Sequence, residues 1–321
     1  MRRNIAVLAL LLSASGLAAA QEFPQRPVRF IVGFAPGGGA DAAARALAQK
    51  MSEAWGQAVL VDNRAGAGGN LAAEAIAKAA PDGYNMLISS PGPIVTSPYL
   101  YEKLAYDPLK ELAPITLIGS GANVMLINPN SPATNVRELI TWARSKPGGL
   151  NYVTSGIGST PHLAAELFGA AAHIDNLVHV PYKSAAPALL DVIAGRGDLM
   201  IVSLPTALGQ IKAGKVRALA VASPKRAPQL PDVPTSEEAG VPGFEVTTWW
   251  GFFAPAGLPG GIITRTNQIA VKALRSQEMR ESLAREGADA IGNSPAEFAA
   301  FIQQESAKWS RVIKTSNIKA E

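Results

Sequence analysis

The segments of this sequence best suited to chemistry are four loops rich in glycine and in hydroxyl side chains. Each of them follows a short apolar run and precedes a helical pattern. They are Pro36–Asp41, Arg64–Asn70, Ser89–Pro93 and Ser155–His162. Free backbone N–H groups and the positive dipole at the start of a helix attract an anion, and glycine lets a ligand approach the backbone closely. Taken singly, each loop is equally compatible with an ordinary strand-to-helix turn. Taken together, the four predict a site for a small anion.

Few side chains are candidates for catalysis or metal binding. His162 and Glu166 stand four residues apart, a spacing that allows both to bind one metal ion, but no further ligand is apparent and we favour a helix-surface pair. The sequence has no G-x-S-x-G elbow, no Walker A sequence and no H-E-x-x-H motif. We therefore predict no catalytic residue, no metal site and no cofactor.

One glycine motif supports an alternative hypothesis. Gly37-x-Gly39-x-x-Ala42 opens a helix, and Asp62 ends the next apolar run about twenty residues on, as in a dinucleotide-binding fingerprint. The export signal described below argues against a nicotinamide enzyme, because such an enzyme would lack a recycled cofactor pool. An exported hydrolase is a second alternative, but it needs a nucleophile–base pair that we do not find.

The elements that position these loops alternate between strand-like and helical segments. Expected strands cover 28–34, 58–62, 85–89, 150–155, 177–180, 199–202, 216–222 and 245–255. Expected helices cover 41–55, 70–79, 161–171, 187–194 and 208–213, and a purely helical tail covers 262–276, 278–286 and 295–314. Strands that alternate with helices indicate βαβ units and a parallel sheet, so we predict an α/β protein with two halves built on one plan.

Composition changes along the chain predict two crossings between these halves, near residue 123 and near residue 247. Asn128–Pro132 interrupts the chain after the apolar run Ala122–Ile127, and the proline-rich stretch Ser223–Phe244 leads into the last expected strand. A helical tail without its own sheet must pack on one already formed. We predict lobe 1 as 24–123 plus 247–321 and lobe 2 as 124–246. Trp249 and Trp250 should place one indole on each face of their strand, with at least one in the core; the other either packs in the core as well or edges a ligand cleft.

The overall composition is that of an exported globular protein. Hydrophobic residues make up 48% and charged residues 17%, which excludes intrinsic disorder, and a net charge of +4 is too small to indicate nucleic-acid binding. The absence of cysteine excludes disulfides and thiolate chemistry. Residues 1–20 combine Arg2-Arg3, the apolar run Ile5–Leu12 and Ala18-Ala19-Ala20, the pattern of a signal peptide cleaved near Ala20.

A series of motifs along the whole mature chain carries a family resemblance. These are Pro27–Asp41, Val61–Gly69, Ala80–Tyr84, Tyr106–Leu112, Tyr152–His162, Val180–Ala188, Leu204–Leu219, Asp232–Gly240, Trp250–Gly257 and Glu305–Ile318. In them the chain resembles the Bug-type periplasmic solute receptors, the substrate-binding components of tripartite tricarboxylate transporters. The resemblance implies a type II periplasmic-binding fold, with two α/β lobes, two hinge crossings and a ligand cleft. It also implies a periplasmic receptor, not an enzyme, that delivers a carboxylate to the membrane subunits of the transporter.

The resemblance further implies how the carboxylate is held: by backbone N–H groups, hydroxyls and ordered waters. Carried onto this chain, the contacts fall on Ala35, Gly37, Gly38, Asp41, Gly66, Ala67, Gly68, Ser89 and Ser90 in lobe 1, and on Ser155, Ser159, Thr160, His162, Tyr182, Lys183 and Ser184 in lobe 2. Family members often carry an Asp where Val202-Ser203 stands here, which leaves the ligand open among dicarboxylates, tricarboxylates, aromatic acids and amino acids. We expect a monomer that contacts its permease through the lobe faces beside the cleft.

Overall fold

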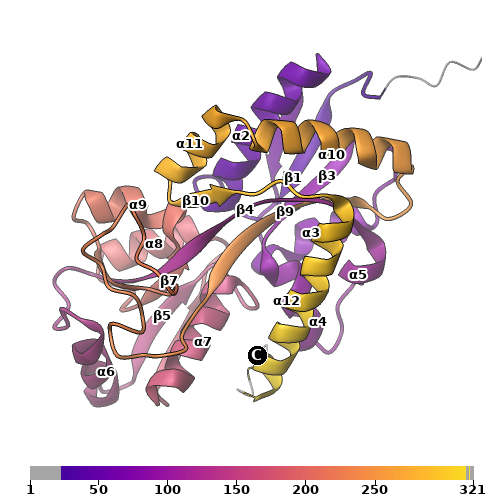
Figure 1. The fold of residues 1–321 in the computed structure, drawn as a ribbon. Helices are drawn as coiled ribbons and strands as arrows, with labels where there is room; N and C mark the ends of the chain where they lie inside the picture. The colour runs from indigo at the N-terminus through magenta and orange to yellow at the C-terminus, as the bar shows by residue number, and fades with distance from the viewer. Residues whose placement is uncertain (1–22, 316–317, 319–321) are drawn as a thin grey trace, which may run out of the picture.

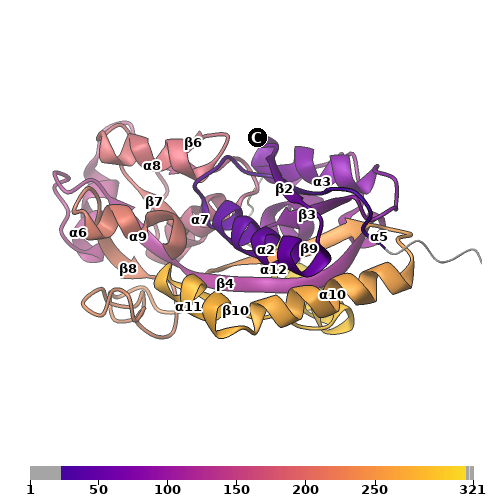
Figure 2. The ribbon, with the colours of Figure 1, turned by 90° about the horizontal axis from the view of Figure 1, so that it is seen from above.

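Strand β4 (Leu112–Ile127) runs through the whole molecule and belongs to both of its lobes (Figures 1 and 2). The computed structural model describes residues 23–315 and residue 318, so the predicted signal peptide lies outside the described residues. Residues 112–122 of β4 pair with β9 (Thr247–Pro255), whereas residues 123–127 pair with β7 (Met200–Ser203) and β8 (Arg217–Val221). The partners of β4 therefore change at the position where the sequence predicts the first crossing, although the lobe boundaries themselves stay a prediction.

Lobe 1 is built on a mixed sheet with the strand order β10-β4-β9-β3-β1-β2. Its further strands are β1 (Val28–Val32), β2 (Val59–Asn63), β3 (Asn85–Ser89) and β10 (Ala288–Ala290). One face carries α2 (Gly39–Trp55), α10 (Gly260–Leu274) and α11 (Gln277–Arg285). The other carries α3 (Asn70–Ala77), the π-helical turn η3 (Gly92–Thr96), α4 (Ser97–Leu100), α5 (Pro108–Glu111) and α12 (Pro295–Thr315) (Figure 1). Strand β1 is parallel to both of its neighbours, as predicted.

Lobe 2 adds its strands to the second part of β4. Strand β5 (Leu150–Thr154) is parallel to β6 (Leu177–Pro181), and a bridge between Tyr152 and Leu199 places β5 beside the start of β7. The helices of this lobe are α6 (Val136–Ser145), α7 (Thr160–Ala172), α8 (Ala185–Ile193) and α9 (Leu204–Lys212).

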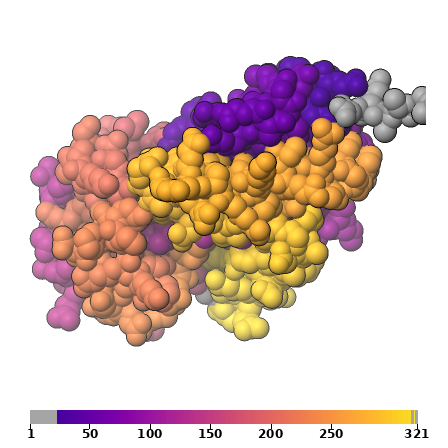
Figure 3. Space-filling model, turned by 45° about the horizontal axis from the view of Figure 1, so that its top comes forward, coloured from indigo at the N-terminus to yellow at the C-terminus, as the bar shows by residue number. Residues whose placement is uncertain are grey.

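The loop after β8 also reaches lobe 1, since the side chain of Gln229 donates a hydrogen bond of 2.6 Å to the carbonyl of Ala284 at the end of α11. Figure 3 shows this side of the molecule, where the α11 segment borders lobe 2.

The buried side chains form three clusters, and one of them is shared by the lobes. Met125 and Ile127 of β4 lie in the shared cluster, whereas Val124 and Leu126 point to the opposite side, into a cluster confined to lobe 2. This alternation is the two-residue period of a strand buried on both faces. No helix in the described part of the chain is both long and apolar enough to cross a membrane.

Two predictions about the sheet were incomplete. The tail is not purely helical, because β10 pairs with Gly119–Gly121 of β4; three residues are too few to show a strand pattern in a sequence. Nor is the sheet wholly parallel, because β4 is antiparallel to β7, β8, β9 and β10. The pairing of β4 with β9 has a simple cause: one strand leaves lobe 1 and the other returns to it, so they run in opposite directions.

Asn123, at the change of partners, should be a costly polar residue to remove from the sheet. Its buried amide donates 2.8 Å to the carbonyl of Val246 and accepts 3.0 Å from the hydroxyl of Thr248. Asn123→Ala leaves both groups without this partner, so we expect it to lower the free energy of unfolding by about 1–3 kcal/mol in urea titrations. Thr248→Val is the matched variant. The double variant should lose less than the sum of the single losses, and strict additivity would contradict the coupling.

Candidate functional site

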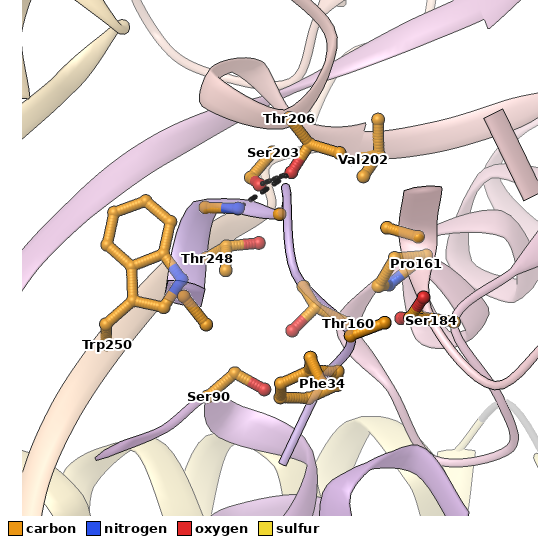
Figure 4. Close-up of a pocket in the computed structure, with 16 residues that line it drawn as sticks. Phe34, Ser90, Thr160, Pro161, Ser184, Val202, Ser203, Thr206, Thr248 and Trp250 are labelled. Carbon is orange, nitrogen blue, oxygen red and sulfur yellow. Dashed lines mark hydrogen bonds between the residues drawn. The ribbon is translucent and has the colours of Figure 1, made fainter. Parts of the chain in front are cut away.

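A pocket lies between the lobes, on the side of the sheet from which α2, α7, α8 and α9 begin (Figure 4). It encloses about 460 Å³ of space free of protein atoms, its open mouth included. Lobe 1 contributes Phe34, Ala35 and Gly38–Ala40, together with Ser90, Thr248 and Trp250. Lobe 2 contributes residues that follow β5 and β6, and residues at the end of β7 and the start of α9. The walls thus come from the carboxyl ends of strands in both halves, where ligands of α/β proteins commonly bind.

Four helices begin at the pocket wall. The residues that precede their first turns are Gly38, Ser159, Ser184 and Ser203, and none of them forms a side-chain hydrogen bond that caps its own helix. The first N–H groups of a helix have no partner within the helix, and the positive ends of the peptide dipoles gather there. The arrangement gives the pocket a positive electrostatic potential without a cationic side chain.

Two hydroxyls in this wall have no hydrogen-bond partner in the described part of the chain. Thr160 and Ser184 are 2% and 1% exposed, and the Oγ1 of Thr160 and the Oγ of Ser184 are both buried and unpaired. Figure 4 shows both residues beside Pro161 on one side of the pocket. A buried hydroxyl without a partner carries a free-energy cost, which a hydrogen bond to a ligand removes. This pair marks an end of the pocket where a ligand can complete the hydrogen bonding of the protein.

In a different part of the wall, the polar groups already have hydrogen-bond partners within the protein. The hydroxyls of Ser203 and Thr206 are 3.0 Å apart, and the Oγ1 of Thr206 accepts a hydrogen bond of 3.2 Å from the N–H of Gly39 (Figure 4). That last bond joins α9 of lobe 2 to α2 of lobe 1. The indole of Trp250 packs so closely on Gly39 that a Cβ there would lie 2.6 Å from its Cζ2.

Asp41 stabilises the first glycine loop. Its carboxylate accepts 3.0 Å hydrogen bonds from the N–H of Gly37, from the Nε of Arg45 and from the amide of Asn63. Burial raises the pKa of Asp41, but these hydrogen bonds together with the charge of Arg45 outweigh burial and hold the pKa below its usual value. The negative charge of Asp41 is therefore engaged by these partners, away from the pocket wall.

Behind the loop Ser155–His162, three rings are stacked. The centroid of His179 lies 4.4 Å from that of His162 and 4.9 Å from that of Tyr152. His162 accepts a hydrogen bond of 3.3 Å from the N–H of Gly158, and His179 is hydrogen-bonded through Nε2 to the Oγ1 of Thr154 at 2.7 Å. Burial, and for His162 also the neighbouring His179, lowers the pKa of His162 to about 3, and burial lowers that of His179 to about 4. Both rings are neutral at pH 7 and support the loop.

The structure brings six of the sequence-predicted residues to the pocket. These are Ala35, Gly38, Ser90, Ser155, Thr160 and Ser184. The remaining ten lie outside its wall: Gly37, Asp41, Gly66, Ala67, Gly68, Ser89, Ser159, His162, Tyr182 and Lys183. Ser159, for example, donates its hydroxyl proton to the carbonyl of Gly156, and the phenol of Tyr182 is hydrogen-bonded to Asp191. Direct ligand contact by these ten residues stays a prediction, and several of them have a different role in the structure.

The alternatives weighed from the sequence receive little support from this geometry. Asp62, the acid of the dinucleotide pattern, pairs with Arg64 at 3.0 Å and is not part of the pocket. Glu166 accepts a hydrogen bond from the phenol of Tyr152 rather than facing a second metal ligand. Among residues 23–315, no group of three or more acidic or histidine side chains is placed to hold a metal ion.

Several pocket residues were not predicted as ligand contacts. They are Phe34, Gly39, Ala40, Pro161, Ala185, Val202, Ser203, Thr206 and Thr248. Helix α9 follows β7 directly, without a glycine loop, so Ser203 and Thr206 gave no loop signal. Trp249 and Trp250 behave as expected: the former lies in the shared core and the latter faces the pocket.

The loop of Gly66–Gly68 contacts the other lobe. A Cβ on Gly68, whose φ is +63°, would lie 2.4 Å from the carbonyl oxygen of Ile157. Nearby, the hydroxyl of Thr96 donates a hydrogen bond of 2.8 Å to the carbonyl of Gly158. The loops Arg64–Asn70 and Ser155–His162 thus meet in a glycine seam between the lobes, where the absence of a side chain at Gly68 lets the two backbones approach.

Comparison with known proteins places the chain in a family. The sequence profile described as tripartite tricarboxylate transporter family receptor matches residues 43–318. A structure of an R. palustris protein with adipate is 38% identical, with a TM-score of 0.90, and the match covers 93% of this chain and 99% of that one. The periplasmic binding protein BugD is 34% identical, with a TM-score of 0.89 and coverage of 93% and 100%. MatC from Rhodopseudomonas palustris with bound malate is 34% identical, with a TM-score of 0.87 and coverage of 91% and 100%.

The histidine stack predicts a loss of stability in mild acid. Both imidazoles have lower pKa values when folded than the ordinary 6.5, so protons bind preferentially to the unfolded chain as the pH falls from about 6.5 towards 4. Each ring should contribute a slope of up to about 1.4 kcal/mol per pH unit in that range. His162→Asn with His179→Gln, which keep polar partners, should flatten the dependence of unfolding free energy on pH. His173→Asn, which removes an exposed histidine, is the control. An equal slope in parent and double variant would refute this account.

The glycine seam predicts a specific effect of a single methyl group. Gly68→Ala should push Ile157 away, open the lobes and cost about 1–3 kcal/mol of stability. Gly214→Ala is the matched control, because its φ of +66° imposes the same backbone strain while nothing lies within 4 Å of its Cβ. Small-angle scattering should show a larger radius of gyration for Gly68→Ala only. Equal radii and equal stabilities for the two variants would contradict the contact.

Proposed function

The chain belongs to the family of tripartite tricarboxylate transporter receptors, and on this premise we propose that it captures a small carboxylate between its lobes and delivers it to the membrane subunits of such a transporter. It has the two-lobed α/β fold of the Bug-type periplasmic binding proteins, as the sequence predicts, and it is a solute receptor rather than an enzyme. The proposal assigns the pocket of Figure 4 as the place where the ligand binds.

The observation that carries the proposal is the pair of unpaired buried hydroxyls at Thr160 and Ser184, each at the start of a helix. A carboxylate is acceptor-only, so it complements groups that donate, and both hydroxyls and helix N-terminal N–H groups donate. A hydrogen bond to a charged group is also stronger than one between neutral groups. The same pocket offers little to a neutral apolar molecule, which would leave both hydroxyls unpaired.

The ligands named for similar structures support this class. One neighbour is described with adipate and another with bound malate, and both are small aliphatic dicarboxylates. The pattern in residues 1–20 and the likeness to a periplasmic binding protein support export to the periplasm. We expect the receptor to be a monomer, and to close when the ligand bridges donors from both lobes.

Removing either of the two hydroxyls should weaken ligand binding without lowering the free energy of unfolding. Thr160→Val and Ser184→Ala should each weaken the binding of adipate or malate by about 1–3 kcal/mol, roughly 5- to 150-fold, in isothermal calorimetry. Without ligand, both variants should be as stable as the parent or more so, because they remove a buried polar group that has no partner.

Thr266→Val is the matched control, since its hydroxyl is equally buried and unpaired but lies on α10, outside the pocket wall. It should leave ligand affinity unchanged. Full affinity in both pocket variants would contradict the assignment of the site. Failure of a panel of mono-, di- and tricarboxylates to raise the melting temperature of the parent would contradict the function, because a ligand at 100 times its Kd adds about 2.7 kcal/mol.

A further inference from the structure

Two hydrogen bonds beside the pocket join the lobes directly, and both partners of each bond belong to the protein. The N–H of Gly39 donates 3.2 Å to the Oγ1 of Thr206, and the hydroxyl of Thr96 donates 2.8 Å to the carbonyl of Gly158. We propose that these two bonds form a latch that closes the lobes before a ligand arrives, with Thr206 and Thr96 as its positioning residues. A ligand then contributes less of the free energy of closure, so the latch raises its affinity.

The latch ties the lobes together near both ends of the pocket. Figure 4 shows Thr206 at one end and Ser90 at the other. The turn η3 begins at Gly92, two residues after Ser90, and ends at Thr96, whose hydroxyl also donates 2.9 Å to the carbonyl of Gly92. Separating the lobes therefore breaks one bond at each end. The closed form is the one in which both bonds are present.

Thr206 supplies the cap that helix α2 lacks. The first N–H groups of a helix have no partner within it, and Gly38, which precedes α2, has no side chain to provide one. Gly39 is buried, and a Cβ on it would lie 2.6 Å from the indole of Trp250, so this helix start is tightly enclosed. The oxygen that accepts from its N–H thus comes from α9 of the other lobe.

Loss of this oxygen acts on the closed form in particular. Valine has the shape of threonine but no acceptor, so closure of Thr206→Val would bury the N–H of Gly39 without a partner. With the lobes apart, water reaches the same N–H and the cost disappears. Thr206→Val should therefore lower the ratio of closed to open receptor by about tenfold.

Thr96 favours closure without fixing it. Its side chain is fully buried, and its hydroxyl lies between the carbonyl of Gly92 in its own lobe and that of Gly158 in the other. When the lobes separate, the hydroxyl keeps its bond to Gly92, so this half of the latch is released at little cost. Thr96 also lies outside the pocket wall, so an effect of this residue on binding cannot come from a direct contact with the ligand.

The absence of cysteine allows the distance between the lobes to be measured directly. Lys78→Cys at the end of α3 and Leu190→Cys on α8 give each lobe one exposed site for a spin label. Figure 2 shows α3 and α8 on the side of the molecule away from β4, so opening should lengthen the distance between them. Without ligand, double electron–electron resonance should show a closed population in the labelled parent. In Thr206→Val and in Thr96→Val, the ratio of the shorter to the longer distance should fall about tenfold.

Conservative variants separate the hydroxyls from other effects. Thr206→Ser and Thr96→Ser keep the hydroxyl and should restore the distances of the parent. Thr141→Val is the control, because that hydroxyl bonds to the carbonyl of Arg137 within α6 and should not affect closure. Circular dichroism confirms that each variant is folded. A parent with only the longer distance would overturn the proposal, and so would valine variants that match the parent or serine variants as open as the valine variants.

The affinity for adipate tests the consequence for binding, and this arm alone rests on the proposed function. Apparent affinity scales with the fraction of receptor that is competent to bind. In calorimetry, both valine variants should therefore lose affinity by the factor by which their closed fraction falls in the distance measurement, about twofold to tenfold. Unchanged affinity despite a smaller closed fraction would overturn the effect of the latch on binding. If adipate and the other carboxylates do not bind the parent, the proposed function is wrong, while the distances without ligand still decide whether the latch exists.

Discussion

The pairing of β4 with two different sets of strands is the constraint on which the rest of this structure depends. Because one strand contributes to both sheets, the lobes share a continuous hydrogen-bonded framework and a buried cluster. The chain returns through β9, antiparallel to β4, and the buried amide of Asn123 joins the two crossings where the partners of β4 change. A movement of one lobe relative to the other must therefore bend the chain near this point.

The pocket shows how an anion can be held without a cationic side chain. Four helix N-termini supply a positive potential from the backbone, and the hydroxyls of Thr160 and Ser184 supply donors. This arrangement has a cost, because unpaired buried hydroxyls destabilise the protein in the absence of ligand. The same cost favours binding, since the ligand is what satisfies them. A receptor that must also release its ligand is well served by donors of moderate strength.

Support for these groups comes from residues that do not line the pocket. Asp41 stabilises the loop Pro36–Asp41 through Gly37, and the stack of His162, His179 and Tyr152 stabilises the loop Ser155–His162. The contact between Gly68 and Ile157 joins a third loop, Arg64–Asn70, to the loop Ser155–His162 across the lobes. Glycine thus serves here mainly to let two backbones approach each other, in addition to letting a ligand approach one of them.

Much of this protein could be predicted from sequence alone. Alternating strand and helix patterns are local properties, so the α/β class, most elements and the loop at Pro36–Asp41 were found, and the family motifs gave the fold. The sequence pattern was too weak to predict β10, which has three residues, or to show that β4 pairs with strands of both lobes. The site was predicted only in part, because Gly66–Gly68 and Ser155–Gly158 look alike as sequence. Packing between the lobes turned the loop of Gly66–Gly68 onto Ile157 and brought the start of α9 to the pocket instead. Local patterns determine where a chain can offer donors, whereas the approach of distant segments decides which donors share one cavity.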